Sequence, residues 1–169
     1  YKNARGFLVP TFNTRPIICV ESVAIGNRIL ILMGSTGGDL ELFDLPASFS
    51  QLKDRWENFA SLWNPVGRYQ VHQMGTNTIS AQVLSIETTN GTMRAIVSIV
   101  TGGDDQSICI SRVKLEQVDK FDMLNNRFKL VQDPCLNVIS EASSSAIKGV
   151  SHFSFRGQLY ILCVGYKIG

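Results

Sequence analysis

An internal repeat is the feature that most restricts what this 169-residue chain can fold into. Thr36–Asp39 (Thr-Gly-Gly-Asp) follows an apolar run, and the same four letters return after another apolar run at Thr101–Asp104, 65 residues later. A second element, Arg68–Gln73, resembles Arg127–Gln132, 59 residues later, and Arg5–Pro10 resembles an earlier copy of it. Units of this kind cannot bury their own faces, so neighbouring units are expected to stack on one another.

Each unit also contains a pattern typical of a β-hairpin. Val23–Ile31, Val83–Val97 and Phe153–Ile161 each join two strand-like runs through a short turn that contains Gly. Such turns need residues that accept a positive φ, which Gly and Asn do most readily. The first run alternates, which indicates one wet face, and the second is continuously apolar, which indicates a strand buried on both faces.

The order of elements is constant from unit to unit. An aromatic strand comes first, then a variable loop, the hairpin, a Gly-rich turn and a last strand, which is typical of propeller blades. The sequence therefore predicts an all-β fold of tandem four-stranded antiparallel meanders, with unit limits at about 5–66, 67–125 and 126–169. These two and a half blades would form part of one β-propeller domain. We expect both chain ends to be cuts, and the ring to be completed by further segments or by other chains.

A short helix is predicted as an insertion between Pro46 and Asn64. Within it the apolar residues Leu52, Trp56, Phe59 and Trp63 follow near-helical spacing, with charged residues between them. Two roles are open for the three aromatic residues: they anchor the helix to a sheet edge, or they dock a partner protein. The segment Val113–Asn126 fits either a similar element or an extension of a strand.

The third unit resembles the epilepsy-associated repeat, also called the EPTP repeat. That repeat pairs an aromatic-x-x-x-Gln strand, here Arg127–Gln132, with a later Phe-x-Ile-x-Gly-x-x-Tyr-Leu hairpin, here within Gly149–Val164. The other units are looser, since Asn90-Gly91 replaces the usual turn. The acidic residue ahead of the family's hairpin is replaced by Ser151-His152. The resemblance implies a seven-bladed propeller in a secreted or cell-surface protein that binds protein partners, and it implies no set of catalytic residues.

Charge and hydropathy favour no nucleic-acid or membrane role. The chain has 16 basic and 14 acidic residues without a basic block, so it lacks the electrostatic footprint of a nucleic-acid-binding protein. No apolar run reaches the roughly 18 residues that a membrane-spanning helix needs. We therefore expect neither a nucleic-acid partner nor a membrane span.

The residue pattern does not predict catalysis, a cofactor or a metal site. The only histidines are His72 and His152, which are expected at the surface or at strand edges. Neither belongs to a zinc-binding or nucleophile motif. The Thr-Gly-Gly-Asp segments are interpreted as hairpin turns, because a phosphate cradle needs a following helix and a calcium loop needs more closely spaced oxygen ligands.

Two features favour an oxidising, extracellular environment. The even number of cysteines (Cys19, Cys109, Cys135 and Cys163) permits two disulfides, although these residues also suit apolar strand positions. Asn90-Gly91-Thr92 combines a hairpin turn with a glycosylation sequon, so Asn90 is a candidate glycan acceptor.

The function predicted from the sequence is that of a non-enzymatic extracellular module for protein binding or assembly. One alternative is an intracellular scaffold propeller of the WD or kelch type, although the Gly-His and Trp-Asp pairs of such repeats are missing. A less favoured alternative is a propeller hydrolase, for which Glu21 and Glu87 are the residues to test.

Overall fold

The computed structural model describes residues 15–46, 64–117 and 127–165, and these residues are all-β, without a helix. Their eleven strands are β1 (Ile17–Ile25), β2 (Arg28–Ser35), β3 (Asp39–Pro46), β4 (Asn64–Gln70), β5 (Thr76–Thr89), β6 (Thr92–Gly103), β7 (Ile108–Gln117), β8 (Phe128–Leu130), β9 (Cys135–Ile139), β10 (Ile147–Phe155) and β11 (Gln158–Gly165). The predicted helical insertion, with Trp56, Phe59 and Trp63, lies outside the described residues. Val113–Gln117 continues β7, which matches the strand extension.

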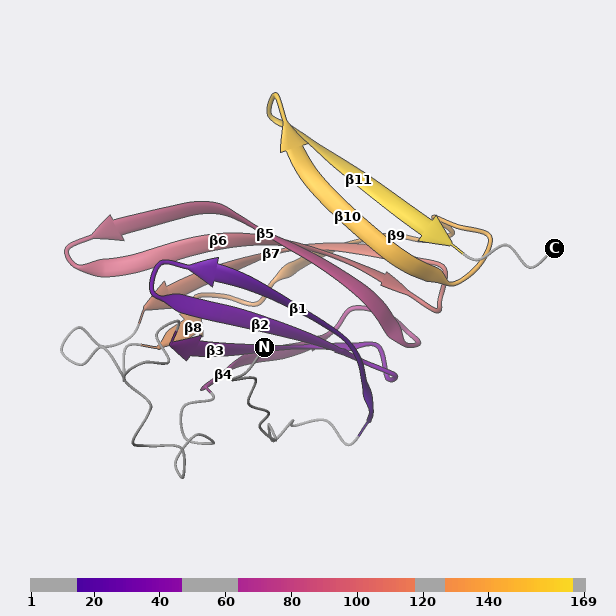
Figure 1. Cartoon of the computed structure of the whole chain (residues 1–169), viewed down its shortest axis with the longest axis horizontal. Coiled ribbons are helices and arrows are strands. Elements are labelled where there is room, and N and C mark those ends of the chain that lie inside the picture. Colours follow the sequence, from indigo (N-terminus) through magenta and orange to yellow (C-terminus); the bar gives the residue numbers. More distant parts are fainter. Residues whose placement is uncertain (1–14, 47–63, 118–126, 166–169) are drawn as a thin grey trace, which may run out of the picture.

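The strands form two large antiparallel sheets and a hairpin (Figure 1). The first sheet has the order β1-β2-β3-β4. The second sheet has the order β5-β6-β7-β8, and β9 pairs with β7 beyond β8, so that β8 and β9 lie end to end along one edge. The strands β10 and β11 form the remaining hairpin, which we call the third hairpin because β1-β2 and β5-β6 form the first two. The predicted all-β fold of antiparallel sheets is confirmed; the first sheet has the predicted four strands, whereas the second has five.

The hairpin that opens each of these three parts starts in the same register, and the second hairpin has a further register shift between Val83 and Ser85. In each one, a β-bulge skips one residue near the start of the first strand. The flanking pairs are Ile17↔Ser35 and Cys19↔Gly34, Thr76↔Gly103 and Thr78↔Gly102, and Ile147↔Gly165 and Gly149↔Val164. Hairpins one and three also have the same length, so residue n of the first corresponds to residue n + 130 of the third.

The tight turns follow the predicted chemistry. Gly26 has a φ of 59°, Asn90 and Gly91 have φ values of 52° and 74°, and Arg156 and Gly157 have φ values of 50° and 77°. These left-handed values explain why Gly and Asn recur at the turns. The positive φ of Arg156 is the exception in residue type.

The turn between the second and third strands also recurs in the two large sheets. Its structurally equivalent residues are not the ones that the Thr-Gly-Gly-Asp repeat aligns. Gly34 faces Leu40 across the first turn and Gly102 faces Ile108 across the second, which makes Gly34 and Gly102 equivalent. The letters instead align Thr36 with Thr101, three residues out of register. Structurally equivalent residues in the two turns therefore have different identities.

The aromatic strand opens the sequence unit but closes a sheet. β4 pairs with β3, and β8 pairs with β7, so each is an outer strand of the sheet that precedes it in the chain. The units that begin near residues 67 and 126 therefore start on one sheet and continue into the next.

The second sheet lies between the first sheet and the third hairpin (Figure 1). One of its faces packs against the first sheet in a core that includes Leu30, Leu32, Ile79, Val97 and Ile99. Its other face packs against the third hairpin through a smaller cluster of Val100, Ile108 and Ile147. We call the face that carries Leu30 and Leu32 in the first sheet, and its equivalent in the other two parts, the leading face.

The first strands of the three parts lie side by side. β5 contacts both β1 and β10. The Cys19 thiol donates to the Thr76 carbonyl at 3.0 Å. On the other side, the Val150 amide donates to Thr78 Oγ1 at 3.2 Å and the His152 amide to Ser80 Oγ at 3.3 Å, so β5 and β10 run in the same direction.

Candidate functional site

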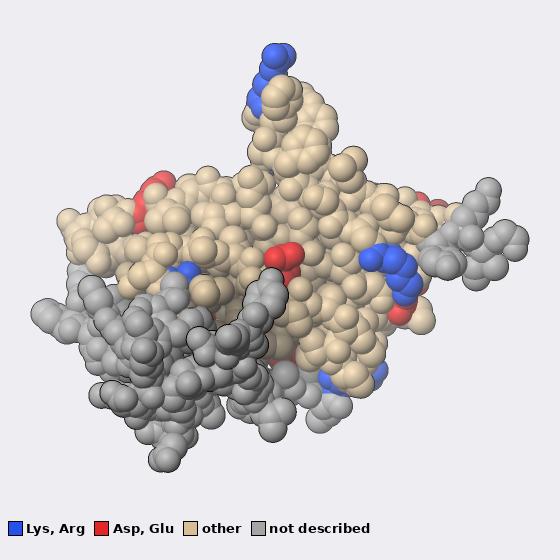
Figure 2. Space-filling model, viewed as in Figure 1, with Lys and Arg blue, Asp and Glu red and all other residues tan. Residues whose placement is uncertain are grey.

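The leading face of the third hairpin is an exposed apolar surface. Its side chains alternate with those that face the second sheet, because successive residues of a strand point to opposite sides. The exposed fractions are 45% for Phe153, 54% for Phe155, 41% for Tyr160, 62% for Leu162 and 67% for Val164. In Figure 2 the hairpin rises from the body of the molecule, and its visible surface is largely uncharged.

The aromatic side chains of this face contact one another. The rings of Phe153 and Tyr160, which are paired across the hairpin, stack with centroids 5.4 Å apart and an interplanar angle of 12°. Tyr160 Oη donates to Gln158 Oε1 at 2.9 Å. The guanidinium of Arg156 lies 5.1 Å from the centroid of the Phe155 ring, in cation–π geometry. These contacts order the face before anything binds to it.

The equivalent residues of the first sheet are buried. Leu30 and Leu32 correspond to Tyr160 and Leu162, and both have no exposed surface. They belong to the core that the first sheet shares with the second. The leading face of the first sheet is thus a contact surface between two sheets. In the third hairpin, the described residues supply no neighbour that covers the same face.

A polar cluster fixes the third hairpin on the second sheet. Asp104 Oδ1 accepts from Asn77 Nδ2 at 2.7 Å and from Lys148 Nζ at 2.9 Å, and the same Asn77 amide donates to the Ile147 carbonyl at 3.1 Å. The hydrogen bonds from Asn77 and Lys148 lower the pKa of Asp104. The turn after β6 and the starts of β5 and β10 are therefore held together, which positions the exposed face.

A second group of functional side chains surrounds His72, which follows β4. His72 Nε2 lies 2.9 Å from Thr101 Oγ1, and Nδ1 lies 3.0 Å from Asp105 Oδ1 and 2.9 Å from Ser107 Oγ. Asp105 Oδ2 accepts from the Gln73 amide at 2.9 Å, which joins the same segment to the β6–β7 turn. Burial lowers the pKa of His72, while the nearby Asp105 carboxylate opposes that effect.

The His72 group has the connectivity of a carboxylate–histidine–hydroxyl triad but not its access. In such a triad the hydroxyl oxygen attacks a substrate while the histidine accepts its proton. Here the hydroxyl at Nε2 is that of Thr101, which is 1% exposed, and His72 itself is 3% exposed. No substrate carbonyl reaches Thr101 Oγ1 in this arrangement. The geometry fits a tether between the two large sheets.

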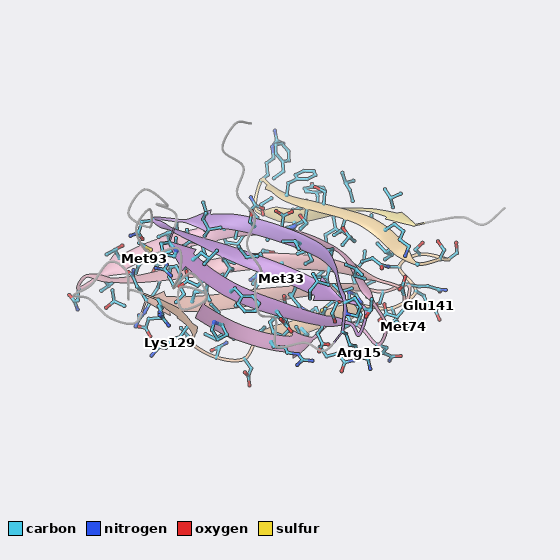
Figure 3. All side chains as sticks on the ribbon, turned by 60° about the horizontal axis from the view of Figure 1, so that its bottom comes forward. Arg15, Met33, Met74, Met93, Lys129 and Glu141 are labelled. Atoms are coloured by element: carbon cyan, nitrogen blue, oxygen red, sulfur yellow. The ribbon has the colours of Figure 1, made fainter. Side chains whose placement is uncertain are left out.

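A polar cavity of about 510 Å³ lies beside this tether. Its lining combines the end of β4 and the segment after it, the β6–β7 turn, and the end of β9 and the segment after it, namely Gln70, Val71, His72, Gln73, Asp105, Ser107, Val138, Ser140 and Glu141. Figure 3 shows Glu141 at the same end of the molecule as Met74 and Arg15, and Met93 and Lys129 at the other end. His72 and Asp105 are already engaged with each other, so the cavity offers no unpaired buried group to recognise a ligand.

The histidine expectation was wrong. His72 and His152 are both buried, and neither occupies an exposed strand edge. His152 packs against β5, where its Nδ1 lies 2.9 Å from Ser80 Oγ. The physical reason is that both side chains point between stacked sheets, where each ring places its Nδ1 beside a serine hydroxyl group. The only sequence signal of this role is a polar residue within a strand-like pattern.

The structure contains no disulfide among the four cysteines, which are all free. The disulfides that the sequence permits are absent, and no cysteine is paired opposite another: Cys19 on β1 faces Gly34, Cys109 on β7 faces Thr101 and Val138, and Cys163 on β11 faces Val150. Cys135 faces Arg112, three positions along β7 from Cys109. Burial raises the pKa of both Cys19 and Cys109 to about 11, as suits the alternative of small apolar strand residues.

Asn90 lies at the tip of the hairpin between β5 and β6, with its side chain exposed. A Cβ on the neighbouring Gly91 would meet nothing within 4 Å, so the tip projects into open space. The position suits a glycan acceptor, which remains a prediction.

Comparison with known proteins assigns neither a family nor a function to the chain. No protein-family model and no curated protein match the chain. In the part of the chain that the structure describes, no group of three His, Cys, Asp or Glu residues could hold a metal ion. The described residues include no helix long and apolar enough to cross a membrane.

Proposed function

We propose that this chain is a non-enzymatic module for protein binding or assembly, in which four-stranded sheets stack as the blades of a β-propeller. One observation carries the proposal: hairpins that start in one register occur three times, and their leading face is covered twice and exposed once. In each covered case the neighbour is another β-structure of the same kind. A protein surface is therefore the expected partner of the exposed copy.

The inner strands support the propeller arrangement. β1, β5 and β10 begin equivalent hairpins and lie next to one another in chain order, as the innermost strands of successive blades do. The resemblance of the third unit to the epilepsy-associated repeat points to the same architecture and to a secreted or cell-surface protein. The exposed tip at Asn90 agrees with that location.

Affinity capture from conditioned culture medium tests the binding function. The immobilised chain is compared with a Leu162→Lys variant, which places a charge on the exposed leading face. Val20→Lys is the matched control, because Val20 is 63% exposed on the opposite face of the first sheet. We expect a specific protein to be retained by the unaltered chain and the control and lost with Leu162→Lys. Equal retention by all three proteins would refute the assigned surface.

The free thiols favour a second candidate, an intracellular scaffold propeller. Reduced cysteines are the rule in the cytosol, whereas extracellular proteins usually oxidise theirs. Mass spectrometry of the native protein separates the candidates: disulfides or a glycan on Asn90 support the extracellular module, and four free thiols with unmodified Asn90 support the scaffold.

A further inference from the structure

The edge of β11 that does not face β10 lacks a neighbouring strand among the described residues. The equivalent strands of the two large sheets have neighbours on both sides: β2 lies between β1 and β3, and β6 lies between β5 and β7. An unpaired edge presents backbone N–H and C=O groups that can pair with an additional strand. The two complete sheets show how such a strand is placed.

The register of that missing strand follows from the repeat. Leu40 faces Gly34 and Ile108 faces Gly102, in each case six residues later in the chain. Val164 is the equivalent of Gly34 and Gly102. A connection of the same length would place the residue opposite Val164 at position 170, so a third strand joined in this way would come from outside residues 1–169.

The two complete sheets also indicate the chemistry of the strand. Opposite Gly34 and Leu32 the first sheet places Leu40 and Leu42, and both are fully buried. Opposite Gly102 and Val100 the second sheet places Ile108 and Ile110. The equivalent positions in the third hairpin are Val164 and Leu162, whose apolar side chains are exposed. An apolar-x-apolar strand would cover them.

We propose that β11 binds an extended polypeptide strand from outside residues 1–169, antiparallel along its free edge, with apolar side chains facing Val164 and Leu162. This inference rests on the proposed binding function and specifies its mode as β-strand addition. In that mode the main-chain hydrogen bonds give affinity and the alternate side chains give specificity. The side chain between the two apolar ones faces Cys163.

Cys163 provides a direct test of the register. The chain's own segment Ser107–Val113 has the proposed pattern, and as a peptide it would place Cys109 opposite Cys163. Directly paired residues of antiparallel strands have Cα atoms about 4.5–5.5 Å apart, which a disulfide can bridge. The peptide is supplied with its cysteine as a 2-pyridyl disulfide. The Cys163 thiolate attacks the peptide sulfur, the new S–S bond forms, and pyridine-2-thiolate leaves with the electron pair and takes up the thiol proton.

The protein is the full chain with Cys135→Ser, which removes the other exposed thiol. The control peptide exchanges the first isoleucine and the cysteine, and so moves the thiol by one residue to the other side of the strand. We expect the matched peptide to modify Cys163 at least about tenfold faster than the control, because binding raises the local concentration of the correctly placed thiol. Peptide mapping identifies the modified cysteine.

Equal rates for the two peptides would overturn the inference. Leu162→Lys is expected to remove the advantage of the matched peptide, and an advantage that survives this change would also count against strand addition. Sedimentation equilibrium tests the remaining alternative, in which a second copy of the chain occupies the edge. A dimer that Leu162→Lys dissociates, together with equal peptide rates, would assign the edge to that second copy. Loss of protein capture with Leu162→Lys but no peptide preference would reject strand addition while leaving the proposed binding function intact.

Discussion

Leu32 and Leu162 occupy the same position of one repeated hairpin, yet Leu32 is completely buried and Leu162 is 62% exposed. Both residues lie on the strand after the tight turn, and they are 130 residues apart. Their pairing across the hairpin is equivalent, so the difference arises from the neighbours outside it, namely β3 beside β2 and the second sheet over the leading face. The second sheet covers Leu32, and no described element covers Leu162.

Alanine substitutions at these two leucines should differ strongly in their effect on the free energy of unfolding. Leu32→Ala is expected to lower the free energy of unfolding by about 2–5 kcal/mol, since it removes buried methyl groups and leaves a cavity. Leu162→Ala is expected to change it by no more than about 0.5 kcal/mol, as surface substitutions usually do. Chemical denaturation of both variants measures the difference. Similar costs at the two positions would mean that the third hairpin's leading face is covered in solution.

The buried ion pair of Arg28 on β2 and Asp44 on β3 predicts a strong energetic coupling between these two residues. Arg28 Nε and Nη2 donate to the two Asp44 carboxylate oxygens at 2.8 and 2.9 Å, and the Phe128 amide donates to the same Asp44 group at 2.8 Å. Asp44→Ala leaves the Arg28 charge buried without its partner, so we expect a loss of about 3–5 kcal/mol.

A double-mutant cycle with Arg28→Met measures this coupling by chemical denaturation. The double variant removes both charges and is expected to be more stable than the sum of the two single losses implies. Strictly additive losses would contradict a direct ion pair. Arg94→Met with Glu116→Ala is the matched control, because that pair lies at the surface and is expected to couple by less than about 1 kcal/mol.

The hairpins could be predicted from sequence because their determinants are local. Gly26, the Asn90-Gly91 pair and Gly157 mark turns whose positive φ few other residues accept, and the strand patterns on each side fix which face is buried. The Thr-Gly-Gly-Asp repeat located the second turns but misaligned them by three residues. There, Gly38 and Gln106 adopt the equivalent left-handed conformation with different side chains.

The tether and the exposed face could not be predicted in the same way. His72 contacts Thr101 and Asp105, which lie 29 and 33 residues away, and nothing in the local pattern specifies that pairing. The exposure of Leu162 likewise depends on which layer lies beside it. A strand of continuous apolar residues predicts burial on both faces, and β11 is the strand where that prediction was wrong.

The four thiols should react at very different rates. Cys135 and Cys163 are exposed, whereas Cys109 is buried and Cys19 donates a hydrogen bond between the first and second sheets. Burial raises the pKa of Cys19 and Cys109 to about 11, which suppresses the reactive thiolate at neutral pH. Alkylation with iodoacetamide followed by peptide mass spectrometry should label Cys135 and Cys163 first. Labelling in denaturant provides the control, and early labelling of Cys109 in the native protein would contradict the fold.

Acidification should destabilise the protein through its two histidines. Burial lowers the pKa of His72 and of His152 below the usual value of 6.5. As the pH falls below 6.5, the unfolded chain binds protons that the folded chain does not, so the free energy of unfolding decreases until the folded-state pKa is passed. At His72 the Asp105 and Asp104 carboxylates reduce this effect. For His152, burial alone lowers the pKa, and no carboxylate opposes it. The buried Nε2 of His152 lacks a hydrogen-bond partner among the described residues.

Urea denaturation between about pH 5 and about pH 8 tests this dependence. The variants His72→Asn and His152→Asn are each compared with the unaltered chain. Both substitutions alter stability at every pH, so the slope with pH is the informative quantity. We expect a shallower slope in each variant. An unchanged slope in both variants would show that the histidines titrate alike in the folded and unfolded chains.

Glycosylation of Asn90 is expected when the chain is expressed through a secretory pathway. Asn90 is exposed at a hairpin tip, and Thr92 completes the sequon two residues later. The informative variant is Thr92→Ala, which removes the sequon but leaves the Asn90-Gly91 turn that sets the hairpin register. We expect a glycan mass on the peptide that contains Asn90 and its loss in this variant, with unchanged thermal stability after enzymatic deglycosylation of the unaltered chain. An unmodified Asn90 in the secreted chain would remove the support that the sequon gives to an extracellular location.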